Sequence, residues 1–342
     1  MLLKELTIAS GVSGDEKEVR DIIIREIKDY VDDIKIDRLG NVIAKKYGKP
    51  GYPMVMLDAH MDEVGLMVKS IDDGGLLKFV AVGGIDERIL VSKPVLVGKD
   101  KIQGVIGAKP IHLQEADERD NPLKIKELYI DIGANSKEEA SKLVKKGDYV
   151  IFDSEFIEFG DNLVKAKALD DRAGCVALIE ILKGEYDVNI VAAFTVQEEI
   201  GLRGAKVAAY GIDPDIALVL EGTVCSDISG VPEAMHITKI GSGPALSMMD
   251  SRTIFPKDLV ERIYDIATAN DIKIQYRTPA PGGNNAGEIH KSREGVLCAA
   301  LSVPCRYIHS PSSVMSKDDF AGLISITKLF LKDIKKGEYT HE

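Results

Sequence analysis

The chain has 342 residues, of which 45% are hydrophobic and 29% charged, a balance typical of a folded protein rather than a disordered one. This length exceeds the roughly 100 to 200 residues of one domain, so we expect two domains or one large domain with an insertion. The formal net charge of -11 and the lack of a basic stripe argue against nucleic acid as a partner.

The first elements in chain order are a helix and three strands. The N-terminus has no apolar region of signal-peptide length. Ser13 and Glu16 match a capping box, and apolar residues at helical spacing follow, which predicts an amphipathic helix. Two strands are expected around the Gly40–Asn41 turn, and PMVMLDAH, residues 53–60, is expected to be a buried strand.

The pattern changes between residues 66 and 162 to short β-type runs separated by turn residues. One helix interrupts them and begins at a second Ser-x-x-Glu pattern, Ser136 and Glu139. We interpret this block as a small β-rich domain inserted into a larger domain formed by residues 1–65 and 163–342.

Helical patterns and apolar runs alternate from residue 163 onward. The runs at 188–196 and 216–220 are continuously apolar, which is typical of strands covered on both faces. Helices are expected at 170–184, 256–270 and 316–334. These elements predict an α/β layer.

Histidines and acids follow several of these apolar runs, where open α/β sheets bind their ligands. Taken singly, a histidine at a strand end is more often structural than a ligand, paired acids at a helix start usually cap it, and a Glu-Glu pair suits a solvated loop. Their recurrence at successive strand ends favours a metal site. The candidates are His60, Asp170, Asp171, Glu198, Glu199, Glu221 and His309.

The chemistry of a dinuclear metal centre requires such a set. Two divalent metals about 3.5 to 4 Å apart need a bridging carboxylate, and each also needs terminal carboxylates and an imidazole. A further carboxylate must stay off the metals to take a proton from the bridging water. Two histidines, one bridging aspartate and three glutamates meet this demand.

Seven segments, in order across the whole chain, resemble the tetrahedral (TET) aminopeptidases, a family of dinuclear metallopeptidases that includes glutamyl aminopeptidases and members labelled cellulase. The segments are HMDEVG, ALDDRAGC, TVQEEIGLRGA, VLEGTVCSDISG, GPALSMMDSR, PGGNNAGEIH and VPCRYIHSP. The resemblance implies a phosphorylase/hydrolase-like catalytic domain, with a mixed sheet and helices on both faces, and a PDZ-like inserted domain that dimerises. It also implies peptide substrates and a hollow homo-dodecamer.

The resemblance assigns the metal ligands residue by residue. Asp170 would bridge two divalent ions, zinc or cobalt. His60 and Glu221 would complete one site, and Glu199 and His309 the other.

Three further roles follow from the resemblance. Glu198 would be the general base that takes the proton of the metal-bridging water and delivers it to the leaving amine. Asp62 would accept the second N–H of the His60 imidazole, and Asp171 would shape the backbone at Asp170.

The chain departs from the family pattern at two places. Many relatives carry Asp where this chain has Glu221, and many carry Thr-Asp where it has Asn284–Asn285, so no role is transferred to that loop. His112 in the inserted block fits either a subunit contact or a turn. The N-terminal residue that the enzyme prefers is set by loops from distant segments and is not readable from the sequence.

Three other functions share parts of this pattern. A related dinuclear deacylase or carboxypeptidase would keep most ligands but hold a substrate carboxylate. An endoglucanase needs two carboxylates flanking a sugar and usually aromatic platforms, which a chain without Trp fits poorly. A non-catalytic assembly or metal-binding protein would have no need of Glu198.

The cysteines and the hydropathy indicate a cytoplasmic protein. The four cysteines are scattered and form no CxxC pair, which indicates reduced thiols rather than disulfides or a thiolate zinc site. No stretch approaches about 18 continuous apolar residues, so we expect no membrane association.

Overall fold

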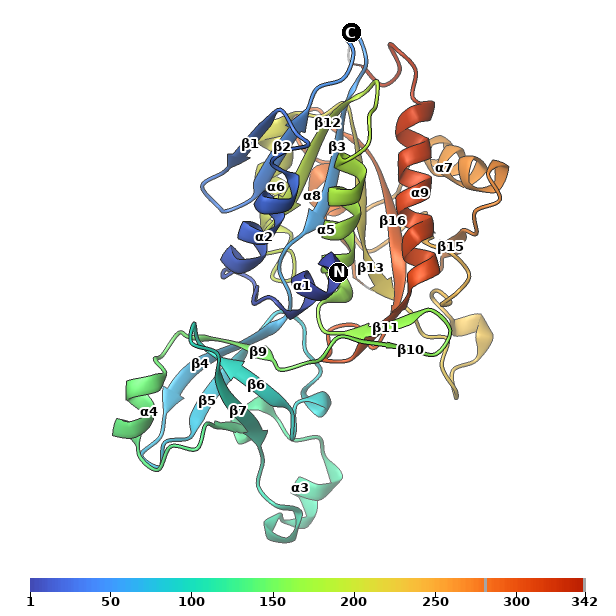
Figure 1. The fold of residues 1–342 in the computed structure, drawn as a ribbon. Helices are drawn as coiled ribbons and strands as arrows, with labels where there is room; N and C mark the ends of the chain where they lie inside the picture. Colours follow the sequence, from blue (N-terminus) through green and yellow to red (C-terminus); the bar gives the residue numbers. More distant parts are fainter. Residues whose placement is uncertain (280–281, 341–342) are drawn as a thin grey trace.

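A large mixed sheet and a small closed barrel together contain all the strands of the described residues (Figure 1). The computed structural model describes residues 1–279 and 282–340, so Pro281 of the PGGNNAGEIH segment lies outside the described residues. Among the described residues, no helix has both the length and the apolar character needed to span a membrane.

Eleven strands of the described chain form the large sheet, nine of them in the order β1–β2–β12–β3–β13–β16–β17–β11–β10, with β14 pairing to β16 and β15 to β14. The central strands β3, β12, β13 and β16 run parallel, and the flanking strands β1, β2, β10, β11 and β17 pair antiparallel. The predicted mixed α/β fold is therefore confirmed. The bounds are β1 Asp33–Ile36, β2 Val42–Lys46, β3 Met54–His60, β10 Ile157–Phe159, β11 Leu163–Ala166, β12 Asn189–Thr195, β13 Ile216–Val224, β14 Ala245–Ser247, β15 Gln275–Arg277, β16 Leu297–Arg306 and β17 Ser313–Ser316.

Helices cover both faces of this sheet (Figure 1). Helix α5 (Leu169–Leu182) packs on β3 and β13 and is itself covered by α1 (Leu2–Ile8), α2 (Lys17–Ile27) and α9 (Lys317–Asp333). Because α5 contacts neighbours on all sides, it is apolar around nearly its whole circumference. Helices α6 (Arg203–Ile212) and α8 (Ala286–Ile289) lie behind the sheet, and α7 (Lys257–Ala269) packs beside α9.

The capping box predicted at Ser13 and Glu16 does not form. Helix α2 begins at Lys17 without a side-chain cap, and Ser13 instead donates a hydrogen bond to Asp62 at 2.6 Å. The Glu16 carboxylate accepts from the amides of Gly14 and Gln197. The local pattern was misleading because tertiary contacts use both side chains. At the second such pattern, Ser136 does accept from an amide of the first helical turn.

The strands between residues 65 and 152 close into a separate six-stranded barrel in the order β4–β5–β8–β7–β6–β9, with a hydrophobic core of its own. It lies beyond the carboxyl ends of the parallel strands, and the segment that contains α3 projects from it (Figure 1). The bounds are β4 Gly65–Ile71, β5 Leu77–Val82, β6 Pro94–Val97, β7 Ile102–Gly107, β8 Tyr129–Asp131, β9 Tyr149–Phe152, α3 Ala116–Asp120 and α4 Lys137–Leu143, with 3-10 turns at Glu87–Ile89, Ile111–Leu113 and Ile125–Glu127. A further 3-10 turn, Glu233–Met235, follows β13 of the large sheet. The division into domains at residues 66 and 162 stays a prediction.

A buried ionic cluster joins the connection from the sheet into the barrel to the segment between β11 and α5. Glu63, which follows β3, accepts hydrogen bonds at 2.6 and 2.7 Å from Lys167, which precedes α5. Arg172 lies 3.2 Å from the same carboxylate and donates to the carbonyls of Leu6 and Met61. Burial lowers the pKa of Lys167 to about 8, although Glu63 opposes this shift.

We expect the Glu63→Gln variant to lose about 3–5 kcal/mol of unfolding free energy, because it removes the carboxylate that two buried cations share. Glu5→Gln is the matched control. Glu5 pairs with Arg25 at the surface, where ion pairs contribute little, so its change should barely affect stability. Chemical denaturation of the three proteins measures the difference, and equal midpoints would contradict the assigned role of the cluster.

Candidate metal centre

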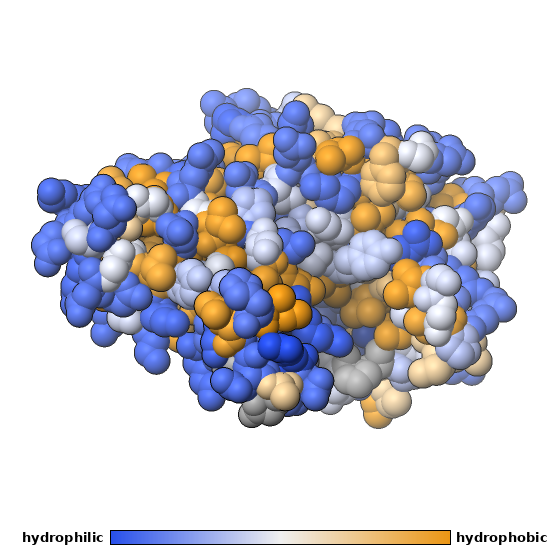
Figure 2. Space-filling view, turned by 90° about the horizontal axis from the view of Figure 1, so that it is seen from below, coloured by the Kyte–Doolittle hydropathy of each residue, from blue (hydrophilic) through white to orange (hydrophobic). Residues whose placement is uncertain are grey.

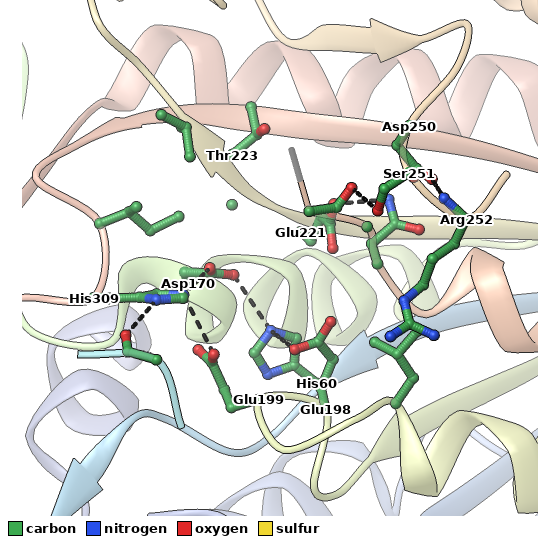
Figure 3. A pocket seen from close by; sticks show the side chains of 18 of the residues that line it. His60, Asp170, Glu198, Glu199, Glu221, Thr223, Asp250, Ser251, Arg252 and His309 are labelled. Carbon is green, nitrogen blue, oxygen red and sulfur yellow. Dashed lines mark hydrogen bonds and ion pairs between the residues drawn. The ribbon is translucent and has the colours of Figure 1, made fainter. Parts of the chain in front are cut away.

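The carboxyl ends of four parallel strands meet at the edge of the sheet that faces the barrel. His60 is the last residue of β3, Glu198 and Glu199 follow β12, Glu221 lies in β13, and His309 follows β16. These five residues and Asp170 line one cavity of about 480 Å³ (Figure 3). The structure thus brings together all the sequence-predicted metal ligands and the predicted base.

The two aspartates at the start of α5 have different tasks. Both have non-helical backbone angles, and Asp171 accepts the amide N–H of Gly174 at 2.8 Å, which caps the regular helix. Asp171 also accepts the backbone N–H of His60. A side chain at Gly174 would collide with Asp171 and with the carbonyl of Leu220, so the cap requires glycine there. Asp170 is left to face the cavity, on a peptide bond to Asp171 that is cis.

Asp170 lies between the two histidines (Figure 3). Its Oδ1 is 3.3 Å from Nε2 of His60, and its Oδ2 is 3.7 Å from Nε2 of His309. Glu199 is 3.3 Å from His309, and Glu198 is 4.0 Å from His60. Two groups of side chains are close enough to share an ion, namely Asp170 with Glu199 and His309, and His60 with Glu198 and Glu199.

Asp62 organises the Glu-Glu pair more directly than it orients His60. Its two carboxylate oxygens accept the amide N–H groups of Glu198 and Glu199 at 2.9 and 3.1 Å. Nδ1 of His60 is 3.5 Å from this carboxylate but only 3.1 Å from the Asp62 backbone carbonyl. The sequence suggested the contact with histidine; it gave no sign that Asp62 also fixes the loop after β12.

The loop that follows β5 contributes to the site through a backbone group. Nδ1 of His309 lies 2.8 Å from the carbonyl of Gly84, which can only accept a hydrogen bond. This contact places the proton on Nδ1 and leaves Nε2 free to face Asp170 and Glu199. Sequence reasoning missed Gly84 because a backbone carbonyl carries no residue-type signal.

Burial and crowding shift the pKa values of the whole cluster. Burial, together with neighbouring carboxylates, raises the pKa values of Glu198 and Glu199 to about 8 each. Burial alone would lower the pKa of His309, but Asp170 and Glu199 raise it to about 9. The pKa of His60 is likewise raised well above its usual value by Glu198, Asp170 and Asp62, against the effect of burial.

This donor set fits divalent cations. Oδ1 of Asp170 is buried and accepts no hydrogen bond, although Nε2 of His60 is nearby. A buried carboxylate oxygen without a partner is costly, and a cation would satisfy it. Imidazole nitrogens and carboxylate oxygens together are ligands that suit zinc and cobalt.

Glu221 lies outside both groups of potential ligands. Its Oε1 accepts a hydrogen bond of 2.8 Å from Nδ2 of Asn284, so the two positions that depart from the family pattern contact each other. Burial and the charges of Asp170 and Glu198 raise the pKa of Glu221 well above its usual value. Its assignment as a metal ligand stays a prediction.

Asn285 is the hydrogen-bond partner of Asp58, the buried aspartate in β3. Its Nδ2 donates to Asp58 at 2.7 Å and to Thr195 at 2.9 Å, beneath the strand ends that carry the site. Burial raises the pKa of Asp58 to about 7. Asp58 is therefore a structural residue of the sheet and does not line the cavity.

Two arginines line the same cavity. Nε of Arg277 donates to Thr223 at 2.9 Å, and its buried Nη1 has no hydrogen-bond partner. The side chain of Arg252 is half-exposed within the same cavity (Figure 3). Asp250, which also lines the cavity, accepts the amides of Arg252 and Thr253 through Oδ1.

Comparison with known proteins identifies a family. A family model described as M42 glutamyl aminopeptidase matches residues 40–326, and a second, described as AMPT, matches residues 1–23. A putative aminopeptidase of Acetivibrio thermocellus is 41% identical over 95% of this chain and 96% of its own. The lysyl aminopeptidase of Pyrococcus furiosus is 34% identical over 99% of this chain and 98% of its own. The glutamyl aminopeptidase of Lactococcus lactis is 31% identical over 93% of this chain and 91% of its own.

Solved structures share the whole fold. A TET aminopeptidase from a marine sediment archaeon of the Thaumarchaeota superposes with a TM-score of 0.95 at 34% identity and covers 99% of this chain and 98% of its own. The TET1 peptidase of Pyrococcus horikoshii is described as assembling into a tetrahedron or a large octahedral shell. It superposes with a TM-score of 0.86 at 38% identity and covers 97% of this chain and 99% of its own. A Thermotoga maritima protein titled endoglucanase superposes with a TM-score of 0.81 at 36% identity and covers 97% of this chain and 96% of its own.

We expect metal affinity to fall as the pH is lowered below about 9. Cations bind the deprotonated ligands, and the free His309 and Glu199 hold protons up to about pH 9 and 8 respectively. Binding near neutral pH should therefore release protons. Titration calorimetry with Zn²⁺ or Co²⁺ in buffers of different ionisation enthalpy measures that release, and an affinity that does not change between about pH 6 and 9 would refute it.

Proposed function

The chain belongs to the M42 glutamyl aminopeptidase family, and we propose that it removes N-terminal residues from peptides at a centre of two divalent ions, zinc or cobalt. The observation that carries the proposal is the convergence of His60, Asp170, Glu198, Glu199 and His309 on one cavity. Asp170 would be shared between the ions, with His60 and Glu221 on one side and Glu199 and His309 on the other.

The acidic end of the cavity explains why the substrate would be an N-terminus. A neutral α-amine is a nitrogen donor of the kind that divalent ions accept, so the ions held at the end of the cavity with Asp170, Glu198 and Glu199 would also bind a free N-terminus. When bound, the ions supply Lewis-acid activation of water and of the scissile carbonyl.

Glu198 would carry the proton during hydrolysis. Its pKa of about 8 lies close to neutral pH, which suits a group that accepts a proton from water and returns it to the leaving amine. Asp62 holds the backbone of Glu198 through the amide and so fixes where this carboxylate can reach.

The cavity gives little support to the alternative functions. No Phe or Tyr appears among its described lining residues, which leaves a sugar ring without an aromatic platform. A carboxypeptidase or deacylase would also use Arg252 and Arg277, which could bind a substrate carboxylate. Rates on substrates with and without a free α-amine must therefore be compared. A non-catalytic role is disfavoured by Glu198, a partly buried carboxylate beside the proposed ligands.

We extend the proposal to assembly and location, namely a cytoplasmic homo-dodecamer whose subunits dimerise through the barrel. Exposed apolar side chains gather among hydrophilic ones on the face seen from the barrel side (Figure 2). Ile111 and Leu113, on the projecting segment of the barrel, are 70% and 58% exposed. Such patches favour contacts between subunits, and light scattering of the purified protein tests the predicted mass.

The Glu198→Gln variant should lose about 10²- to 10⁴-fold in kcat on an aminoacyl chromogenic amide while it keeps its metal, because only the proton carrier is removed. Glu199→Gln is the matched change at the adjacent ligand, and it should weaken metal binding. Metal analysis and rates on both variants test the assignment. A Glu198 variant that is fully active would exclude this residue as the base.

Arg252 and Arg277, which both line the cavity, predict that acidic N-terminal residues are preferred. Glutamyl amides should be cleaved with a higher kcat/KM than lysyl amides. Arg277→Met should reduce the rate on glutamyl amides about 10- to 100-fold, as expected for a lost hydrogen bond to a charged group, and should leave leucyl amides nearly unchanged. Faster cleavage of lysyl than of glutamyl amides by the unmodified enzyme would contradict this preference.

A further inference from the structure

Asn284 is oriented by two fixed partners. Its side-chain Oδ1 accepts the amide N–H of Ala286 at 2.9 Å, and its Nδ2 donates to Oε1 of Glu221 at 2.8 Å. Because an amide N–H can only donate, the contact with Ala286 decides which end of the side chain is oxygen. The NH₂ group must therefore face Glu221.

The surroundings hold this arrangement in place. Asn284 is only 4% exposed, although it lines the cavity. Two residues before Asn284, the carbonyl of Gly282 accepts hydrogen bonds from the amide and the hydroxyl of Ser251. The next residue, Asn285, donates hydrogen bonds to Asp58 and Thr195. The loop is thus bound on both sides of Asn284, and the amide has little freedom to turn away from Glu221.

We propose that Asn284 is a positioning residue that occupies Oε1 of Glu221 and so presents the other oxygen, Oε2, as the one that binds a cation. This inference rests on the proposed function, in which Glu221 is a ligand. It assigns a task to an asparagine whose place in the sequence gives no indication of one, and it makes Oε2 the preferred coordinating oxygen of Glu221.

The charge of the cavity explains why the partner is an amide. Glu221 already lies in the field of Asp170 and Glu198, which raise its pKa together with burial. An aspartate at position 284 would keep the acceptor for Ala286 but place another negative charge against Oε1. An asparagine supplies the donor without adding charge, and donors of this kind fix metal-binding carboxylates.

The test is a double-variant cycle on metal binding by the full-length protein. Asn284→Ala should weaken the binding of one of two Co²⁺ or Zn²⁺ ions about 10- to 100-fold in titration calorimetry. In a Glu221→Gln background the same change should have almost no further effect, since Asn284 acts through Glu221. Asn284→Asp, which preserves the contact with Ala286, should weaken binding at least as much as Asn284→Ala.

The controls separate positioning from folding. Asn270→Ala removes the same side chain at the surface, where Nδ2 of Asn270 donates only to the carbonyl of Ile266, so it should leave the metal dissociation constants unchanged. Thermal unfolding of the metal-free variants shows whether each one folds. The inference would be overturned if Asn284→Ala and Asn284→Asp bound metal with dissociation constants within about twofold of the unmodified protein. It would also be overturned if Asn284→Ala weakened metal binding equally in the Glu221→Gln background. If the unmodified protein bound fewer than two ions, the proposed function itself would fail instead.

Discussion

The buried ion cluster of Glu63, Lys167 and Arg172 is the constraint on which the site depends. Glu63 comes three residues after His60, and Lys167 three residues before Asp170, so their contact fixes both ligand-bearing segments relative to each other. The first of these segments leads from the sheet into the barrel, and the second connects β11 to α5. Arg172 adds the N-terminal segment through the carbonyl of Leu6. The predicted metal ligands His60 and Asp170, far apart in sequence, are thereby held by one shared, buried set of charges.

A second constraint is the crowding of negative charge that this framework creates. Asp170, Glu198, Glu199 and Glu221 share one cavity, and burial raises the pKa values of the three glutamates because water cannot solvate their charges. Cations would relieve this cost, which links metal binding to the charge state of the site. The carbonyl of Gly84 and the amide of Asn284 add orientation to this cluster and bring no further negative charge.

Some features were predictable because they depend on local pattern. The alternation of apolar runs and helical patterns identified the central strands and helices α5, α7 and α9, since buried strands and amphipathic helices differ in period. The histidines and acids at strand ends could also be identified, because parallel strands bring their carboxyl ends to one edge of the sheet. The capping box at Ser13 failed because a hydrogen bond to Asp62, 49 residues away, replaced the local one.

The sequence by itself determined the α/β layer, the β-rich character of residues 66–162 and the identity of the side chains available to bind metal. Only the tertiary structure decided which groups meet those side chains. It paired Asp62 with the amides of Glu198 and Glu199, the Gly84 carbonyl with His309, and Asn284 with Glu221. These contacts join segments distant in the chain and often use backbone atoms, which every residue type carries. Residue identity therefore cannot encode them locally, and they exist only once the chain has packed.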